Sequence, residues 1–197
     1  INQLDDPRLI VNWKLDETEG MFAADSIGDN DAVVLGGVEW LPNGGQINGA
    51  LKMDGVSGYA LTGAVLNPAD GPFSILAWTN GGLPGQVVMS QQGATNWLAV
   101  GDEGNLMTEV KGPGRSSSPL LSQTVITDGL WHRIGLVWDG SNRTLYIDDV
   151  AVADDTQPNL EGSKMGLYIG TGKAMEAGTY FSGLIHAIPI YNRPPTP

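Results

Sequence analysis

The sequence has no cysteine among its 197 residues. Disulfide bonds, thiolate metal sites and a cysteine nucleophile are therefore excluded, so packing and hydrogen bonds alone must hold the fold together. This absence does not place the chain in a reducing compartment, because many secreted proteins also lack cysteine. A chain of this length can bury roughly 70% of its unfolded surface in one core, which allows stability without cross-links.

Basic residues are scarce. Ten lysines and arginines stand against 22 aspartates and glutamates, which gives a formal net charge of -12. A surface of this sign repels phosphate backbones and anionic lipid headgroups, so we expect no nucleic-acid partner. The carboxylates suit divalent cations or neutral polyols as partners. The alternative is an acidic surface that only keeps the protein soluble.

Long apolar runs and helical periodicity are both missing. No stretch approaches the ~20 apolar residues needed to cross a bilayer, so we expect no membrane insertion. No segment sustains an apolar repeat at i, i+3 and i+4, so helices should be limited to a turn or two, such as residues 67–70.

Glycine and proline are abundant, and they separate short segments in which apolar and polar residues alternate. The clearest example runs from Trp131 to Asp149, where alternating residues flank the turn Asp139-Gly140-Ser141-Asn142. Alternation around an Asp-Gly turn predicts a half-buried antiparallel hairpin. Further strands are predicted for residues 9–16, 32–35, 38–41, 50–53, 59–62, 73–79, 86–91, 97–101, 106–110, 120–125, 151–153, 165–169 and 181–191.

These segments recur about every ten residues, which is typical of all-β domains. The strand over residues 73–79 is apolar on both faces and is predicted to be central, as expected when two sheets pack face to face. The sequence therefore predicts an all-β fold, a two-sheet antiparallel β-sandwich with twelve or more strands. Residues 1–193 are predicted to form one domain, and residues 194–197 to begin a proline-rich linker.

Several blocks of sequence resemble one known family. The pattern of Trp131-His132 followed by Trp138-Asp139-Gly140 closely resembles a late hairpin of laminin-G-like domains, which belong to the concanavalin A-like lectin/glucanase (jelly-roll) superfamily. Residues 13–20, 24–32, 50–55, 73–78 and 181–193 are similar to other blocks of the family, in the same order. The resemblance covers nearly the whole chain. It implies a concanavalin A-like jelly roll, a common accessory domain of larger exported bacterial proteins.

An acid-rich loop follows the first predicted strand, from Asp16 to Asn30. Calcium takes six to eight oxygen ligands, and a glycine such as Gly28 lets the backbone turn its carbonyl groups inward. The loop is not an EF-hand, because the Asp-x-Asp-x-Asp-Gly register and the closing glutamate are missing. The alternative is a set of solvated turn residues, with Asp25 forming an Asx-turn.

The resemblance assigns a structural calcium ion to this loop. It implies that Asp25 is the side-chain ligand, that Gly28 and Asn30 add backbone or amide oxygens, and that the closing strand completes the shell. At the closing strand, the family's usual Gly-x-Ile-Asp-Glu is replaced by residues 183–187, where His186 would offer its backbone carbonyl. Loss of both acids weakens a site whose affinity depends on ligand charge.

Two of the six tryptophans are candidates for ligand binding. Trp40 and Trp97 each lie beside a polar loop, so their rings would stack on a sugar face while amides such as that of Asn96 bond its hydroxyl groups. The alternative is that both rings lie at the edge of the core. The basic segment of residues 111–118 either borders a binding groove or has no role in binding. The other tryptophans are expected in the core or at its edge: Trp13, Trp78, Trp131 and Trp138.

Catalytic patterns are missing. The chain has two histidines, His132 and His186, and no Gly-x-Ser-x-Gly elbow accompanies them. The first resembles a framework residue of the family. Glycosidases of this architecture use Glu-x-Asp-x-x-Glu on one strand, because two carboxylates must project from one face about 5 Å apart. No such motif occurs, so we expect no enzymatic activity.

Together these features predict a non-catalytic recognition module of a larger exported bacterial protein, which is secreted, periplasmic or on the cell surface. Its partner would be a polysaccharide or glycoconjugate, and other domains of the longer chain would lie beside it. One alternative is a structural or adhesive spacer that binds no small ligand. A glycan-cleaving enzyme is the third hypothesis.

Overall fold

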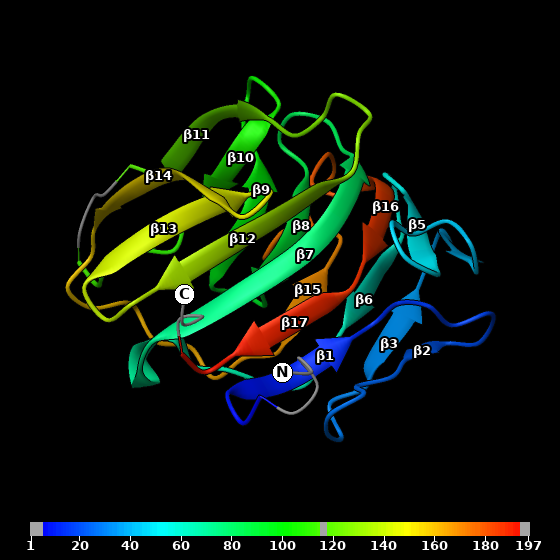
Figure 1. Cartoon of the computed structure of the whole chain (residues 1–197), viewed down its shortest axis with the longest axis horizontal. Helices are drawn as coiled ribbons and strands as arrows, with labels where there is room; N and C mark the ends of the chain where they lie inside the picture. The colour runs from blue at the N-terminus through cyan, green and yellow to red at the C-terminus, as the bar shows by residue number, and fades with distance from the viewer. Residues whose placement is uncertain (1–5, 115–117, 194–197) are drawn as a thin grey trace.

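The structure is a computed structural model that describes residues 6–114 and 118–193. These residues form two antiparallel sheets stacked face to face, which confirms the predicted all-β sandwich (Figure 1). The predicted linker at residues 194–197 and residues 115–117 of the basic segment lie outside the described residues. No helix in the described part of the chain is long and apolar enough to cross a membrane.

Nine strands form sheet A, whose strands β7, β12 and β13 face the viewer in Figure 1. The strand order is β14-β13-β12-β7-β16-β5-β4, while β17 pairs with the first half of β7 and β1 pairs with β17. The strands are β1 (Leu9–Trp13), β4 (Val38–Leu41), β5 (Ala50–Asp54), β7 (Phe73–Gly81), β12 (His132–Trp138), β13 (Asn142–Ile147), β14 (Val150–Thr156), β16 (Ser182–His186) and β17 (Ile188–Tyr191).

Eight strands form sheet B, which packs behind sheet A. Its order is β11-β10-β9-β8-β15-β6-β3-β2, and every pairing in it is antiparallel. The strands are β2 (Phe22–Ala23), β3 (Ala32–Leu35), β6 (Tyr59–Leu61), β8 (Val87–Gln91), β9 (Thr95–Val100), β10 (Asn105–Thr108), β11 (Leu120–Val125) and β15 (Leu167–Ile169). A single helical turn, η2 (Pro68–Asp70), forms where the sequence predicts one.

The predicted hairpin is confirmed as β12 and β13, whose register places Trp138 opposite Arg143. The Asp139 carboxylate accepts hydrogen bonds from the backbone N–H groups of Ser141 (2.8 Å) and Asn142 (2.7 Å), which closes the turn between them. β7 is central, as predicted, because β12 lies on one side of it and β16 and β17 lie on the other. The aromatic and alternating pattern of this region therefore places the middle of sheet A correctly.

The predicted strand over residues 181–191 is broken in two. β16 ends at His186 and β17 begins at Ile188, because Ala187 adopts a positive φ of 46°. The Ala187 N–H donates to the Lys14 carbonyl oxygen (3.0 Å). The break lets the chain pair with both halves of β7 and leaves His186 at the bend.

The core lies between the sheets, and three aromatic rings join the two layers. Phe73 on β7 and Trp138 on β12 come from sheet A, and Trp97 on β9 comes from sheet B. The ring centroid of Phe73 lies 5.6 Å from that of Trp97 and 6.5 Å from that of Trp138. All three rings are buried, so they contribute a large apolar area to the contact between the sheets.

Candidate functional site

Strand β7 directs alternate side chains to opposite faces of sheet A. Phe73 and Ile75 point into the core and are buried, whereas Trp78 lies on the outer face and is partly exposed. Trp78 pairs with Arg133 on β12 and with His186 on β16. Residues paired across neighbouring strands have side chains on the same face, so these three form a row on the outer surface of sheet A.

This row lines a groove of about 350 Å³, which we call the Trp78 groove. Its apolar members offer surface for a ring to pack against, and its polar members offer hydrogen-bond donors and acceptors. The groove is lined by Leu9, Asn12, Lys14, Asp16, Asn48, Trp78, Arg133, His186, Ala187, Pro189 and Tyr191.

His186 is almost fully buried at one end of the row, with 6% of its surface exposed. Burial lowers the pKa of its ring, although hydrogen bonding to the backbone of Gly49, the Asp16 charge and the backbone of Lys14 act in the opposite direction. The ring is therefore neutral at pH 7, and its Nδ1 has no hydrogen-bond partner among the described residues. A neutral imidazole has one donor and one acceptor nitrogen, and Nδ1 is buried beneath the groove rather than exposed in it.

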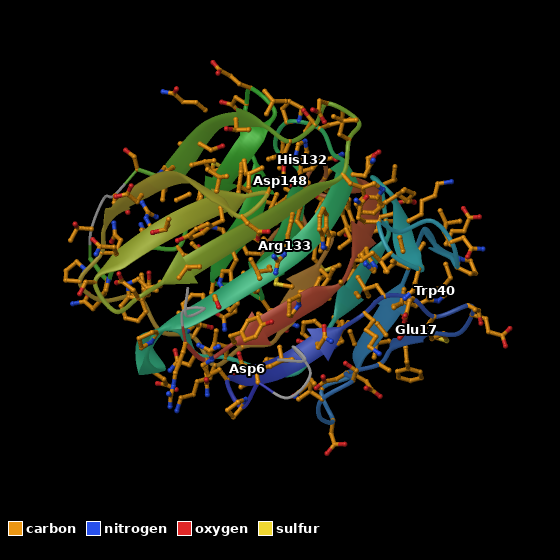
Figure 2. All side chains as sticks on the ribbon, viewed as in Figure 1. Asp6, Glu17, Trp40, His132, Arg133 and Asp148 are labelled. Carbon is orange, nitrogen blue, oxygen red and sulfur yellow. The ribbon has the colours of Figure 1, made fainter. Side chains whose placement is uncertain are left out.

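Acidic side chains hold Arg133 at the other end of the row. Its Nη1 donates to Asp149 (2.6 Å) and its backbone N–H donates to Asp148 (2.9 Å). His132 also contacts Asp148 through Nδ1 (2.8 Å) and Asp128 through Nε2 (3.1 Å), and Figure 2 shows His132 and Asp148 side by side. Burial disfavours the charged ring of His132, but the two carboxylates outweigh burial and raise its pKa. His132 therefore links two loops, which is a structural role.

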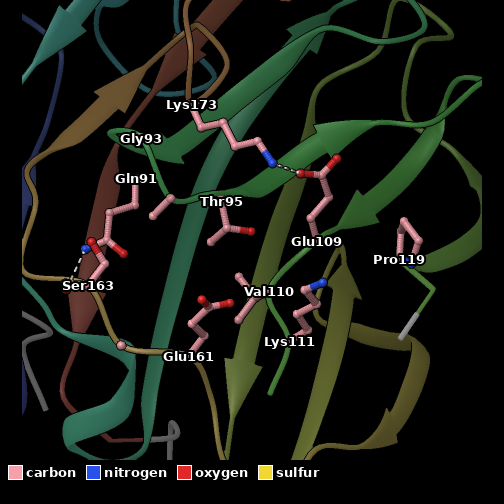
Figure 3. Close-up of a pocket in the computed structure, with 12 residues that line it drawn as sticks. Gln91, Gly93, Thr95, Glu109, Val110, Lys111, Pro119, Glu161, Ser163 and Lys173 are labelled. Carbon is pink, nitrogen blue, oxygen red and sulfur yellow. Dashed lines mark hydrogen bonds and ion pairs between the residues drawn. The ribbon is translucent and has the colours of Figure 1, made fainter. Parts of the chain in front are cut away.

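A second pocket, which we call the Gln91 pocket, lies at one end of sheet B and measures about 480 Å³ (Figure 3). It shares no lining residue with the Trp78 groove. The polar loop between β8 and β9, which the sequence singles out beside Trp97, forms part of its wall, and the basic segment contributes Lys111. The pocket is lined by Gln91, Gly93, Ala94, Thr95, Glu109, Val110, Lys111, Pro119, Glu161, Gly162, Ser163 and Lys173.

Trp97 does not reach either pocket. Its side chain is fully buried and packs against Phe73 across the two sheets. The prediction that its ring stacks on a sugar is therefore wrong, because no face of the ring is open to a ligand. The polar loop before Trp97 borders a pocket, but alternation along β9 turns the ring itself into the core.

The other two predicted ligand-binding residues lie apart from each other. Trp40 on β4 is partly buried and donates its Nε1–H to the Gly20 carbonyl (2.9 Å), and Figure 2 shows it well separated from Arg133 in the Trp78 groove. Asn96 does not line either pocket, but its Oδ1 accepts a hydrogen bond from the backbone N–H of Lys173 (3.0 Å), which lines the Gln91 pocket. The structure does not bring these residues together in one site, and the binding role of each stays a prediction.

N–H donors of its own loop and of β1 enclose the Asp25 carboxylate. Oδ1 accepts from the backbone N–H groups of Asn12 and Ile27 (both 3.0 Å), and Oδ2 accepts from the backbone (3.3 Å) and the side-chain amide (3.2 Å) of Asn30. Burial raises the pKa of Asp25, but these hydrogen bonds outweigh it and hold the pKa below its usual value. Gly28 lies against Oδ2, since a Cβ atom at this position would be 3.2 Å from it.

The contacts of Asp25 give no support to the predicted calcium ion, which stays a prediction. N–H groups face both oxygens of Asp25, and Asn30 turns its amide nitrogen toward them, whereas a calcium ion needs oxygen ligands there. Strand β1 separates His186 from the Asp25 loop. Trp13 on β1 pairs with Asp25 at one edge of the strand, and at the other edge it pairs with Ile188 of β17, two residues after His186. Within residues 6–114 and 118–193, no group of three or more acidic, histidine or cysteine side chains is placed to hold a metal. The predicted grouping of His186 with Asp25 is therefore wrong.

Asp25→Ala is expected to lower the free energy of unfolding by about 2–3 kcal/mol, because buried N–H groups lose their acceptor. The pKa of Asp25 lies below its unfolded value, so its contribution is full above about pH 4 and is lost as the pH falls through the folded pKa. Thermal melts of Asp25→Ala and of the exposed control Asp29→Ala measure the difference. EDTA should leave the melting temperature unchanged. If EDTA lowers the melting temperature of the wild-type domain but not that of Asp25→Ala, calcium binding at Asp25 is supported.

Sequence reasoning missed two of the three residues that form the row in the Trp78 groove. It placed Trp78 in the core or at its edge, and it gave Arg133 no role. One signal was available: Trp78 has the opposite parity to Phe73 and Ile75, so it lies on the other face of the strand. The pairing of Trp78 with His186 had no such signal, because it depends on a contact between residues more than 100 positions apart.

The two stacked antiparallel sheets define a jelly-roll β-sandwich. A family model described as "Concanavalin A-like lectin/glucanases superfamily", of the laminin-G type, matches residues 53–197. The chain therefore belongs to this family, as the resemblance in the sequence indicated. No curated protein matches the sequence significantly.

Solved structures share the fold at low sequence identity. The binding domain of Paraclostridial Mosquitocidal Protein 1 is 14% identical, with a TM-score of 0.80 over 98% of this chain and 51% of that one. The binding domain of Botulinum Neurotoxin DC in complex with SialylT is 14% identical, with a TM-score of 0.70 over 94% of this chain and 48% of that one. The chain thus spans about half the length of these two proteins.

A third structure matches over nearly its whole length. Domain 4 of AbnA, a GH43 extracellular arabinanase from Geobacillus stearothermophilus, was solved in complex with arabinotriose and is 15% identical. The TM-score is 0.66, over 94% of this chain and 93% of that one. At these identities the likeness shows a shared fold, which is found in domains that bind carbohydrate.

Proposed function

We propose that this domain is a non-catalytic carbohydrate-recognition module of a larger exported bacterial protein, and that it binds its glycan in the Trp78 groove. The observation that carries the proposal is the row in which Trp78 lies between His186 and Arg133. The match to the arabinanase domain supports it, because that domain has the same extent and is described with arabinotriose. An extracellular, periplasmic or cell-surface location follows from such a partner.

The chemistry of the groove suits a sugar ring. A sugar presents C–H groups on its flat faces and hydroxyl groups on its rim, so it needs an apolar platform with polar groups around it. The Trp78 ring supplies the platform, since it is partly exposed on the outer face. The guanidinium of Arg133, the amide of Asn12 and the carboxylate of Asp16 line the groove around this platform and can bond the hydroxyl groups.

The groove favours binding over cleavage. Hydrolysis of a glycosidic bond requires two carboxyl groups, about 5 Å apart in retaining enzymes and roughly 6.5–9.5 Å apart in inverting ones. Among the described residues that line the groove, Asp16 is the sole carboxylate. One carboxylate can accept hydroxyl hydrogen bonds, but it cannot act as both acid and nucleophile. We therefore assign the groove a recognition role.

Trp78→Ala is expected to weaken glycan binding about tenfold or more, which corresponds to about 1.4 kcal/mol, because the stacking platform is lost. Affinity electrophoresis in gels that contain arabinan and other polysaccharides identifies a ligand, and calorimetry with the matching oligosaccharide gives the affinity. Trp78→Phe retains a ring and should retain part of the affinity. Trp40→Ala is the matched control at a distant, partly buried tryptophan, and should bind normally.

The outcomes separate the three hypotheses. Loss of binding in Trp40→Ala but not in Trp78→Ala would move the site to the position suggested by the sequence alone. If the folded wild-type domain binds none of a broad panel of polysaccharides, the spacer hypothesis is favoured. Release of reducing sugar from any of these polysaccharides by the purified domain would favour the enzyme.

A further inference from the structure

Gln91 is the last residue of β8 and is fully buried at the wall of the Gln91 pocket. Its side-chain Nε2 donates to three backbone carbonyl groups, those of Leu66 (3.1 Å), Ser163 (3.0 Å) and Met165 (3.1 Å). Three acceptors on one side fix which end of the amide is nitrogen. The carbonyl oxygen must therefore point away from them.

That oxygen, Oε1 of Gln91, is buried and has no hydrogen-bond partner among the described residues. Figure 3 shows the side chains of Gln91, Thr95 and Glu161 directed into the same space. A buried acceptor without a partner is costly, so a group that donates a hydrogen bond to it is bound favourably. The pocket therefore calls for a ligand with hydrogen-bond donors.

The charges around the pocket select against ionic ligands. Lys173 and Glu109 form an ion pair across one wall, with 3.5 Å between Nζ and Oε2. Lys111 and Glu161 also line the pocket, so its two positive and two negative side chains balance. A free anion or cation would meet one repulsive partner for each attractive one, whereas a neutral hydroxyl group can donate to a carboxylate and accept from an ammonium group.

Hydrogen bonds connect the segments that form the wall of the Gln91 pocket. Asn96 ties its two sides together, because its backbone carbonyl accepts from the Glu109 N–H (3.0 Å) and its Oδ1 accepts from the Lys173 N–H (3.0 Å). On the other side, the Glu161 N–H donates to the Lys111 carbonyl (2.9 Å). These bonds fix the backbone positions of the four residues that carry the charged side chains of the wall.

We propose that the Gln91 pocket is a second ligand site, which takes a neutral sugar residue through hydrogen bonds rather than through aromatic stacking. A ring hydroxyl group donates to Oε1 of Gln91, and neighbouring hydroxyl groups bond Thr95 and Glu161. The site does not overlap the Trp78 groove, so one domain contacts two sugar residues or two chains at once. Two weak contacts to one polysaccharide raise the overall affinity without any new interaction.

The test is a titration of the isotope-labelled domain, followed by NMR, with arabinotriose, glucose and glycerol in turn. A neutral sugar should shift the backbone amide signals of Gly93, Thr95 and Lys173, and glycerol should shift them less at equal hydroxyl concentration. Thr95→Val and Glu161→Ala are expected to weaken this binding about tenfold, because each removes one hydrogen-bonding group at the wall without disturbing the buried Gln91.

Lys164→Ala is the matched control, since Lys164 is exposed beside Ser163 but does not line the pocket. It should bind like the wild-type domain. Trp78→Ala should abolish shifts around the Trp78 groove and leave those of the Gln91 pocket, so failure of one site is distinguished from failure of the other. Absence of shifts at the pocket with both sugars, or equal shifts with glycerol, would overturn the proposal.

Discussion

Arg143→Met is expected to lower the free energy of unfolding by about 2–3 kcal/mol, because the Asp155 carboxylate, which is 38% exposed, and two backbone carbonyl groups lose a charged hydrogen-bond donor. Arg143 lies on β13 with its side chain fully buried, and it forms a bidentate ion pair with Asp155 on β14. Nε donates to Oδ1 (2.6 Å) and Nη2 donates to Oδ2 (2.8 Å). Removal of the guanidinium leaves the Asp155 carboxylate without these donors.

The same guanidinium holds the segment that leads into the Gln91 pocket. Its Nη1 donates to the Val110 carbonyl and its Nη2 to the Ser118 carbonyl (3.0 Å). Val110 lines the pocket, so the substitution should also alter the pocket wall. Chemical denaturation of Arg143→Met measures the loss of stability.

Two further variants make the Arg143 prediction specific. Arg133→Met breaks the exposed pair with Asp149, and such pairs contribute about 0–1 kcal/mol, so this control should unfold almost like the wild type. The double variant Arg143→Met with Asp155→Leu removes both charges and should recover part of the lost stability. If Arg143→Met costs less than the exposed control, the buried pair is not a stabilising element of the native fold.

Trp97→Ala is expected to destabilise the domain by about 3–5 kcal/mol, as large aromatic deletions in a core do. The Trp97 ring comes from sheet B and packs on Phe73 of sheet A, so its removal leaves a cavity between the two layers. Any loss of glycan binding in this variant would follow from unfolding. Measurement of the melting temperature beside the binding assay separates the two effects.

Trp97→Phe is the discriminating variant. It keeps a ring against Phe73 and removes the Nε1–H, which is buried without a hydrogen-bond partner among the described residues. Because an orphaned donor is itself costly, its removal offsets part of the lost packing, and we expect a loss of only about 1 kcal/mol with unchanged glycan affinity. A folded Trp97→Phe domain that no longer binds its glycan would falsify the placement of Trp97 in the core.

The sequence predicts most of the strands, because the alternation of apolar and polar residues that marks a strand lies within a few neighbouring positions. The hairpin of β12 and β13 follows from alternation around Asp139 and Gly140, and the central position of β7 follows from its two apolar faces. The break between β16 and β17 was missed, because Ala187 is not a residue that normally favours a positive φ. Its conformation is imposed by the pairing of the two strands with different parts of β7.

The site was predicted only in part. The polar loop of residues 91–96 does border a pocket, because loops between strands of a hairpin lie at the surface. In the loop that contains Asp25, Gly28 and Asn30, N–H donors surround the Asp25 carboxylate, and the calcium ion stays a prediction. An aspartate in a tight loop attracts backbone amides and cations equally well, so the residue types alone do not choose between the two.

What the sequence determined by itself is the set of strands, their alternation and the family, since each depends on residues close together in the chain. Tertiary structure alone decided which tryptophans are buried and which line a groove. The local sequence places Trp97 beside a polar loop and Trp78 in a strand with two apolar faces, but the stacking of the two sheets puts the Trp97 ring between the layers and the Trp78 ring outside them. A binding surface built across strands depends on register between distant segments, and no local pattern encodes that register.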